Sequence, residues 1–275
     1  MPRVGIVGLG TAVPERIVTN FELEKIVDTS DEWIRTRTGI RERRISDPQT
    51  PTSALATEAA KLALKDANIS PEEIDLVIVA TISPDMIFPA TSCLVQANLG
   101  AKKAAAFDLS AGCSGFVYAL TVGEQFIKTG VYKTVLVIGA DELSKQTDWT
   151  DRNTCVLFGD GAGAVVLRQV SADEGILSTY LGADGEGVEL LKIEAGGTRL
   201  PLSKEVLEQR LHYIQMAGNE VYKFAVNIMG EASLKALELA GISIDQVNLF
   251  IPHQANIRII DGAAKRLGLS PEKVY

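Results

Sequence analysis

An ungapped internal repeat constrains the fold of this chain more than any other feature of its sequence. Residues 58–78 align with residues 231–251, and the two segments carry the same amino acid at nine positions. In each copy, a run with helical periodicity leads through an Ile-Ser pair into an apolar run of strand length. Because a repeated helix-turn-strand unit indicates duplication, we expect two similar α/β halves.

The order of the expected elements predicts a layered α/β fold. Apolar runs at 3–9, 74–81, 103–109 and 134–139 alternate with helical patterns. Such alternation favours a mainly parallel sheet covered by helices. The polar stretch at 171–175 suggests a division into an N-terminal half, residues 1–172, and a C-terminal half, residues 173–275. Applying the offset of the repeat to Cys113 points beyond Tyr275. We therefore expect the second half to be incomplete, either by truncation or natively.

Composition and charge exclude several classes of function. A net charge of −8 argues against general nucleic-acid binding, and three cysteines without a C-x-x-C spacing argue for a reducing, cytoplasmic environment without structural zinc. No leader pattern and no apolar run of bilayer length is present, so neither export nor membrane insertion is expected. The glycines between Gly5 and Gly10 do not predict a dinucleotide site, since Pro14 disfavours the helix that such a site needs.

Cys113 is the strongest candidate nucleophile. It lies in Asp108-Leu-Ser-Ala-Gly-Cys113-Ser-Gly-Phe116, between a strand-like run and a helical pattern that ends at Gly130. At such a turn, unpaired backbone N–H groups and the helix dipole favour the thiolate, and small neighbours let a substrate approach. The alternative is a buried structural cysteine. Cys93 and Cys155 lie within apolar runs, and we expect them in the core.

The chain offers only two histidines as partners for a cysteine. His212 lies in a strand-like alternation, which favours a structural role. His253 follows the second copy of the repeated strand, in Pro252-His253-Gln-Ala-Asn256, and ligand sites in α/β sheets lie beyond the carboxyl ends of strands. Because Cys113 also follows a strand, we expect the two side chains to meet where the halves join.

Two charged stretches indicate binding surfaces. The run from Asp31 to Arg44 combines Trp33 with several arginines, which suits a nucleotide-bearing substrate, although a solvated charged face is equally compatible. In the helical pattern at 256–267, the residues Ile257, Ile260, Ala264 and Leu267 would form a buried stripe. Basic side chains would then face solvent on an acidic protein, where they could bind an acidic partner or form an ordinary wet surface; these are Arg258, Lys265 and Arg266.

Four motifs together resemble those of the β-ketoacyl-acyl carrier protein synthase III family. They are Thr36-Arg-Thr-Gly-Ile-Arg41, Ala111-Gly-Cys113-Ser-Gly-Phe116, Phe158-Gly-Asp-Gly-Ala-Gly163 and Pro252-His-Gln-Ala-Asn256. The resemblance implies a thiolase-like fold and an acyltransferase that starts fatty-acid synthesis. By this resemblance, Cys113 takes an acyl group from acyl-CoA, and decarboxylation of malonyl-acyl carrier protein then gives a 3-oxoacyl product with help from His253.

The same resemblance assigns further residues and partners. It implies a homodimer without a tightly bound cofactor or metal, in which Phe88 lines the acyl pocket of the partner. Coenzyme A would contact Trp33, Arg37 and Arg152, with Asn219 and Asn256 near its pantetheine arm. Docking of the carrier protein would use four basic residues, namely Lys223, Arg258, Lys265 and Arg266.

Departures from the family pattern leave other functions open. The family pairs its histidine with an asparagine of a Gly-Asn-Thr motif, and it has a glycine-rich loop near its C-terminus; neither is found in this sequence. Losing one oxyanion donor typically costs about 10² to 10³ in rate, so impaired condensation is expected. The alternatives are a related polyketide starter, chalcone-type or hydroxymethylglutaryl-CoA synthase, a cysteine acyl hydrolase, and an inactive paralogue or fragment.

Overall fold

The computed structural model describes residues 2–275 and divides the chain into two compact units. Unit 1 comprises Met1–Ile17, Arg44–Ser144 and Gly159–Leu177, and unit 2 comprises Val18–Arg43, Lys145–Phe158 and Ser178–Tyr275. Both units draw on separate stretches of the chain, so they differ from the halves 1–172 and 173–275. That division into halves stays a prediction. No helix within residues 2–275 combines the length and apolarity needed to cross a membrane.

Unit 1 is built on a five-stranded sheet in the order β1-β7-β6-β4-β5. Strand β4 pairs in parallel with both β5 and β6, whereas β7 pairs antiparallel with both β6 and β1. The sheet is therefore mixed, and the expectation of a mainly parallel sheet holds only for its β6-β4-β5 part. The strands are β1 (Arg3–Ala12), β4 (Leu76–Ala80), β5 (Ala105–Leu109), β6 (Val135–Glu142) and β7 (Asp160–Val170).

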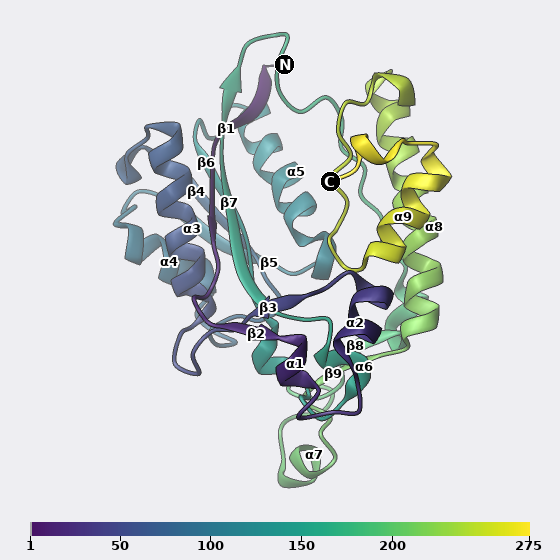
Figure 1. Cartoon of the computed structure of the whole chain (residues 1–275). Coiled ribbons are helices and arrows are strands. Elements are labelled where there is room, and N and C mark those ends of the chain that lie inside the picture. The colour runs from purple at the N-terminus through teal and green to yellow at the C-terminus, as the bar shows by residue number, and fades with distance from the viewer. Residues whose placement is uncertain (1) are drawn as a thin grey trace. The chain divides into compact units, whose positions relative to one another are not determined.

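Successive side chains of the central strands pack alternately into two separate hydrophobic cores. In β4, Val77 and Val79 pack into one cluster, while Leu76, Ile78 and Ala80 pack into the other. Figure 1 shows α3 (Thr52–Ala67) and α4 (Thr91–Leu99) on one face of this sheet and α5 (Gly115–Lys128) on the opposite face. Because each face is covered, β4 is a continuous apolar run, and burying each of its larger side chains contributes about 1.5–3 kcal/mol.

The glycines near the N-terminus serve packing. A Cβ on Gly8 would lie 2.4 Å from the carbonyl oxygen of Ala63, and one on Gly10 would lie 2.2 Å from that of Ala59. These glycines let β1 approach the backbone of α3 directly. Their role is thus close helix–strand contact, and the absence of a dinucleotide site at these glycines stays a prediction.

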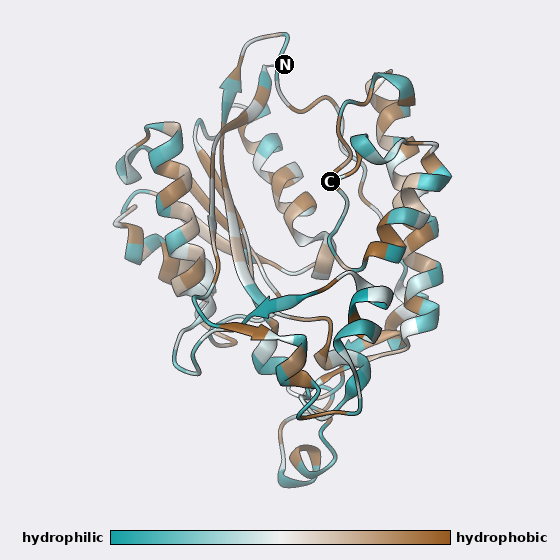
Figure 2. Cartoon of the chain, viewed as in Figure 1, coloured by the Kyte–Doolittle hydropathy of each residue, from teal (hydrophilic) through white to brown (hydrophobic). Residues whose placement is uncertain are grey.

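Unit 2 consists mainly of helices and short strands. Figure 2 shows hydrophobic and hydrophilic residues alternating around its two longest helices, α8 and α9. β8 and β9 form an antiparallel pair, and a second small sheet joins β2 (Ile17–Thr19) to β3 (Glu42–Arg44). The other elements are α1 (Asn20–Leu23), α2 (Asp31–Thr38), α6 (Arg152–Cys155), β8 (Leu191–Ile193), α7 (Lys204–Glu208), β9 (Ile214–Met216), α8 (Gly218–Ala240) and α9 (Ile257–Leu267).

The packing of α9 differs in one position from the predicted stripe. Ile260, Ala264 and Leu267 are buried as expected, but Ile257, the first residue of the helix, is 41% exposed. Close contact with α8 explains a small residue on α9: a Cβ on Gly262 would lie 3.0 Å from Val226 Cγ2.

Candidate functional site

Cys113 lies in unit 1 at the turn between β5 and α5, which confirms the prediction for its local structure. One 3₁₀ turn, Gly112–Ser114, separates the strand from the helix, and the cysteine is exposed. Gly112 has a φ of +53°, which favours glycine, and a Cβ at this position would meet nothing within 4 Å. On the inner side, a Cβ on Gly115 would lie 3.2 Å from Ala80 Cβ. The turn therefore has open space beside Gly112 and an exposed Cys113, while α5 begins against the end of β4.

The surroundings of Cys113 in unit 1 do not favour the thiolate that the sequence predicts. Loss of water raises the pKa of the thiol and the charge of Asp141 raises it further, whereas a backbone N–H lowers it. Asp141 is fixed on β6, since its Oδ1 accepts hydrogen bonds from Thr81 Oγ1 (3.0 Å) and from Ser83 Oγ (2.8 Å). Although the residue as a whole is exposed, the loss of water around Sγ and the fixed carboxylate of Asp141 thus outweigh the backbone N–H, and the pKa of the thiol lies above its ordinary value.

The other two cysteines differ from each other. Cys155 in α6 is fully buried, as predicted, and loss of water is the main cause that raises its pKa to about 11. Cys93 in α4 is exposed, so its assignment to the core was wrong. The reason is that α4 packs through a face that includes Val95 and Leu99, and Cys93 lies outside that face.

Trp33 and Arg152 come together within unit 2, although the sequence separates them widely. Arg152 Cζ lies 4.3 Å from the centroid of the Trp33 ring, a cation–π distance. Both residues lie in the first turn of a helix whose N-terminus is capped by a side chain. Trp33 N donates to Ser30 Oγ (3.1 Å) at the start of α2, and Asn153 N donates to Asp151 Oδ1 (3.0 Å) at the start of α6. Arg152 Nε is buried and has no hydrogen-bond partner within the described chain. The pair forms a fixed aromatic and cationic surface.

A buried arginine that the sequence analysis missed supports this surface. Arg43 is 5% exposed, and its guanidinium donates to Val18 O (3.1 Å) and to Asn20 Oδ1 (2.7 Å). Asn20 Nδ2 in turn donates to Asp31 Oδ1 at 2.9 Å, at the start of α2. The burial of Arg43 could have been inferred only from strand alternation. In β3, Arg43 points inward while its two neighbours are less buried. In a run of charged residues, that signal is weak.

The end of α2 lies against the start of α9. A Cβ on Gly39, just after α2, would lie 3.0 Å from Ile257 Cβ. Arg37 is exposed in the last turn of α2. Asn256 caps α9 by accepting a hydrogen bond from Arg258 N (2.9 Å), which leaves its amide NH₂ as the group that could donate to a ligand.

His253 lies in unit 2 in the segment before α9. The preceding residues form no strand, only one parallel bridge between Phe250 and Val274, so the expected strand end is reduced to that bridge. Pro252 is buried, and Gln254 Nε2 donates to its carbonyl oxygen at 3.1 Å, which leaves His253 exposed between them. Loss of water lowers the pKa of His253, so its imidazole is neutral at pH 7. The meeting of Cys113 and His253 stays a prediction.

The predicted docking residues all lie on α8 or α9. Lys223 and Lys265 are exposed. Arg258 Cζ lies 5.4 Å from the centroid of the Tyr222 ring. Arg266 differs from the others because it donates to Asn227 Oδ1 and Glu231 Oε1, each at 2.9 Å, so part of its charge is already matched. Asn219 is exposed at the second position of α8.

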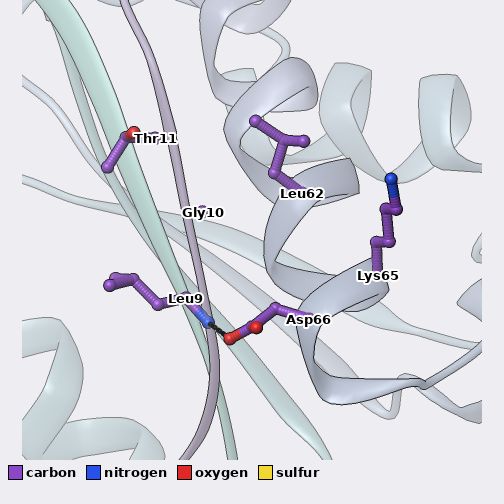
Figure 3. Close-up of a pocket in the computed structure, with 6 residues that line it drawn as sticks. All are labelled: Leu9, Gly10, Thr11, Leu62, Lys65 and Asp66. Carbon is purple, nitrogen blue, oxygen red and sulfur yellow. Dashed lines mark hydrogen bonds between the residues drawn. The ribbon is translucent and has the colours of Figure 1, made fainter.

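Three further features concern regions away from these residues. Phe88 in unit 1 is 86% exposed, beside Ile87 at 90%. Figure 3 shows a surface pocket of about 520 Å³ between β1 and α3, where Leu9 N donates to Asp66 Oδ2 at 2.9 Å. β1 and β5 are opposite edges of the sheet, so this pocket is remote from the Cys113 turn. His212 is half-buried, with its ring centroid 4.0 Å from that of Tyr213, which suits a structural residue.

Comparison with known proteins gives concordant results along the whole chain. The family model described as 3-oxoacyl-[acyl-carrier-protein (ACP)] synthase III matches residues 107–185, and the model of its C-terminal part matches residues 237–275. The β-ketoacyl-[acyl-carrier-protein] synthase III of Caldanaerobacter subterraneus subsp. tengcongensis is 60% identical over 271 residues, which are 98% of this chain and 82% of that protein. Its namesake from Desulfitobacterium hafniense is 58% identical over 274 residues, covering 100% of this chain and 83% of the relative.

Solved structures agree with the sequence relatives. The crystal structure of 3-oxoacyl-[acyl-carrier-protein] synthase III from Aquifex aeolicus superposes with a TM-score of 0.91 at 51% identity, covering 99% of this chain and 83% of that chain. Because this identity extends over nearly the full length of this chain, the chain shares both the fold and the sequence motifs of these proteins. The chain accordingly belongs to the β-ketoacyl-[acyl-carrier-protein] synthase III family, the thiolase-fold condensing acyltransferases that start fatty-acid synthesis.

Proposed function

We propose that Cys113 accepts an acyl group from acyl-CoA and that this group then condenses with malonyl-acyl carrier protein. The observation that carries this proposal is the exposed thiol at the β5–α5 turn. There a thioester carbonyl can reach Sγ, and the backbone N–H groups at the start of α5 are suited to stabilise the developing oxyanion. Acyl-CoA is a substrate in this scheme, and no tightly bound cofactor takes part.

The raised pKa of Cys113 and the lowered pKa of His253 favour a neutral pair over an ion pair. In the proposed acylation, His253 takes the Sγ proton, the thiolate attacks the thioester carbon, and the proton passes to the departing CoA thiolate. In the condensation, the malonyl carboxylate leaves as carbon dioxide and the resulting carbanion attacks the acyl-cysteine, which releases Cys113. His253 Nε2–H would donate to the enolate oxygen during this step.

The proposed coenzyme A site lies on unit 2. The adenine would stack on the Trp33–Arg152 pair, whose buried and unpartnered Arg152 Nε is compatible with a further acceptor. Arg37 would contact phosphate, because an arginine at an exposed helix end can present a forked set of donors. Asn219 and Asn256 would donate to or accept from the pantetheine amides.

The proposed protein partners use charge on unit 2 and apolar surface on unit 1. Lys223, Arg258 and Lys265 would attract an acidic carrier protein to this acidic chain, with Arg266 contributing less because Glu231 already pairs with it. Phe88 would enter the acyl pocket of a second copy in a homodimer, which would remove a very exposed aromatic ring from water. Such substrates place the proposed activity in the cytoplasm.

Mass spectrometry after incubation with acetyl-CoA tests the nucleophile. We expect one acetyl group on the peptide that contains Cys113, and none in Cys113→Ser. Cys93→Ser is the matched control, since Cys93 is also exposed; it should be acetylated at Cys113 as fully as the wild type. Acetylation that persists in Cys113→Ser would show that another residue is the nucleophile.

Product analysis separates condensation from the alternative acyl hydrolase. A condensing enzyme holds the acetyl group until malonyl-acyl carrier protein arrives and then forms a 3-oxoacyl product. A hydrolase releases acetate without the malonyl substrate. His253→Ala should reduce condensation by about 10² to 10³.

Arg258→Glu with Lys265→Glu should raise the KM for malonyl-acyl carrier protein about tenfold and leave acylation intact, with Lys61→Glu on α3 as the control.

A further inference from the structure

Arg210 and Asp148 form a doubly hydrogen-bonded ion pair in unit 2. The guanidinium donates twice to the carboxylate, from Nε to Oδ2 and from Nη2 to Oδ1, each at 2.5 Å. Arg210 Cζ also lies 5.0 Å from the centroid of the Tyr213 ring. Two parallel charge-assisted hydrogen bonds and a stacked ring hold the guanidinium in one orientation, which a surface pair rarely achieves.

The backbone of Arg210 supports a specific role for this pair. Arg210 has a φ of +60°, a left-handed conformation that a long side chain rarely adopts. Strained residues persist where surrounding contacts over-determine them, and they cluster at functional sites. The Arg210 side chain therefore holds its segment in a conformation that the backbone alone would not favour.

Asp148 transmits this order to Arg152. Its Oδ1 accepts hydrogen bonds from Thr150 N (2.8 Å) and Thr150 Oγ1 (2.7 Å), and Asp151 N donates to the Asp148 carbonyl (3.0 Å). These contacts close the turn that ends at Asp151, the cap of α6. The next residue is Arg152, whose side chain stacks on Trp33. The position of that stack thus depends on the turn that Arg210 clamps.

The other end of the Arg210 segment leads to Asn219. β9 follows Arg210 and packs against α6, and α8 with Asn219 begins directly after β9. The clamp therefore acts directly on the turn before α6, where Asp148 accepts its hydrogen bonds, whereas Asn219 lies beyond the intervening β9 and makes no part of the clamp. Nothing in the sequence singles out either residue, because an isolated Arg and an isolated Asp in loops carry no pattern.

We infer that Arg210 is a positioning residue which, through Asp148, holds Arg152 on Trp33 and so sets the preference for nucleotide-bearing thioester donors over donors that carry pantetheine alone. This inference rests on the proposed coenzyme A site. It predicts that the clamp acts on recognition of the nucleotide and leaves the pantetheine end and the chemistry at Cys113 unchanged.

Calorimetric titrations with coenzyme A and with 4′-phosphopantetheine test it. In Arg210→Asn, the Kd for coenzyme A should rise about tenfold, while the Kd for 4′-phosphopantetheine should stay within about twofold. Asparagine tolerates the left-handed conformation better than most residues, so the fold should be kept; Arg210→Lys, which keeps the charge but loses the fork, should give an intermediate value. Lys204→Gln, which removes an exposed pair on the same segment, is the control and should match the wild type.

A double-mutant cycle with Arg152→Ala supplies the deciding outcome. If the clamp works through Arg152, Arg210→Asn should have no further effect on the coenzyme A Kd in the Arg152→Ala background. Additive effects, equal losses for both ligands, or no loss in Arg210→Asn would each overturn the inference. The wild type reports separately on the proposed function: if it binds coenzyme A no more tightly than 4′-phosphopantetheine, the proposed nucleotide site itself is wrong.

Discussion

The two copies of the internal repeat have the same local structure but different surroundings. In the first copy, Asn68 ends α3 with a φ of +52° and Ile69 N donates to Leu64 O at 3.0 Å. In the second, Gly241 ends α8 with a φ of +68° and Ile242 N donates to Leu237 O at 3.1 Å. Hydrogen bonds within about six residues are therefore reproduced almost atom for atom.

The next turn is also shared. Ser70 N donates to Glu73 Oε1 at 3.0 Å, and Ser243 N donates to Gln246 Oε1 at the same distance. Each serine starts one 3₁₀ turn, Pro71–Glu73 in the first copy and Ile244–Gln246 in the second. This agreement supports the prediction of a duplicated helix-turn-strand unit as far as the turn.

The copies diverge where the strand should begin. Leu76 and Ile78 are 1% and 0% exposed in β4, which pairs with neighbours on both sides. Their counterparts Leu249 and Ile251 are 51% and 68% exposed, next to a single bridge at Phe250. The difference teaches that similar residues encode the turn by local contacts, whereas a strand requires partners from elsewhere in the chain.

Truncating the equivalent leucines should give the largest contrast between the copies. Leu76→Ala leaves a cavity between strands and should cost about 2–5 kcal/mol of unfolding free energy, whereas Leu249→Ala should cost about 0.5 kcal/mol. Urea unfolding followed by circular dichroism measures both. Equal costs would mean that Leu249 is covered in solution, for example by a second copy of the chain.

Substitution at the helix ends should show where the copies are alike. Asn68→Ala and Gly241→Ala both place alanine in the left-handed region, and each should cost about 1–2 kcal/mol. A Cβ on Gly241 would meet nothing within 4 Å, so its cost is conformational and not steric. Asn68→Gly is the control and should be nearly neutral. Costs that differ strongly between the two sites would contradict a common cap geometry, and thermal unfolding of the three variants would reveal it.

Substitutions in the 3₁₀ turn should give the smallest difference in stability between the two copies. In the first copy, this difference should depend on pH. The hydrogen bond from Arg168 is the main cause that lowers the pKa of Glu73 below its ordinary 4.5, with a smaller contribution from Ser70 N. A lowered folded-state pKa stabilises the protein above the unfolded pKa, and this stability is lost as pH falls through the folded pKa.

Comparison of Glu73→Gln with the wild type at several pH values measures that effect. The variant should be less stable at pH 7 and should approach the wild type in acid, because a protonated Glu73 then resembles glutamine. Gln246 already carries the amide, so Gln246→Ala should cost the same at every pH. If the difference in unfolding free energy between Glu73→Gln and the wild type were the same at every pH, the lowered pKa of Glu73 would be contradicted.

The candidate site divides in the same way between what could and could not be predicted. The turn at Cys113 follows from a strand pattern, small residues and a helical pattern that are contiguous in sequence. The electrostatic environment of Cys113 does not follow from that stretch, because Asp141 lies on β6 and its hydrogen-bond donors lie in the loop after β4. Cys93 was placed wrongly in the core because a helix of nine residues with mixed polar and apolar side chains does not show from its sequence which face packs.

The surface proposed for the nucleotide required the tertiary structure or knowledge of the family. Trp33 and Arg152 stack although neither marks the other in the sequence, and Arg43 and Arg210 order their surroundings from distant segments. Charged residues give no hydrophobic period, so a buried arginine looks like a solvated one until its partners are known.

By itself, the sequence determined the duplicated turn, the helix ends and the strand-to-helix position of Cys113, because each depends on hydrogen bonds and dihedral preferences spanning only a few residues. Only the tertiary structure decided that β7 runs antiparallel, that β4 is buried while residues 249–251 are not, and that Arg210 clamps Asp148. Those outcomes depend on contacts between residues far apart along the chain, whose free energy appears only when distant segments exclude water together.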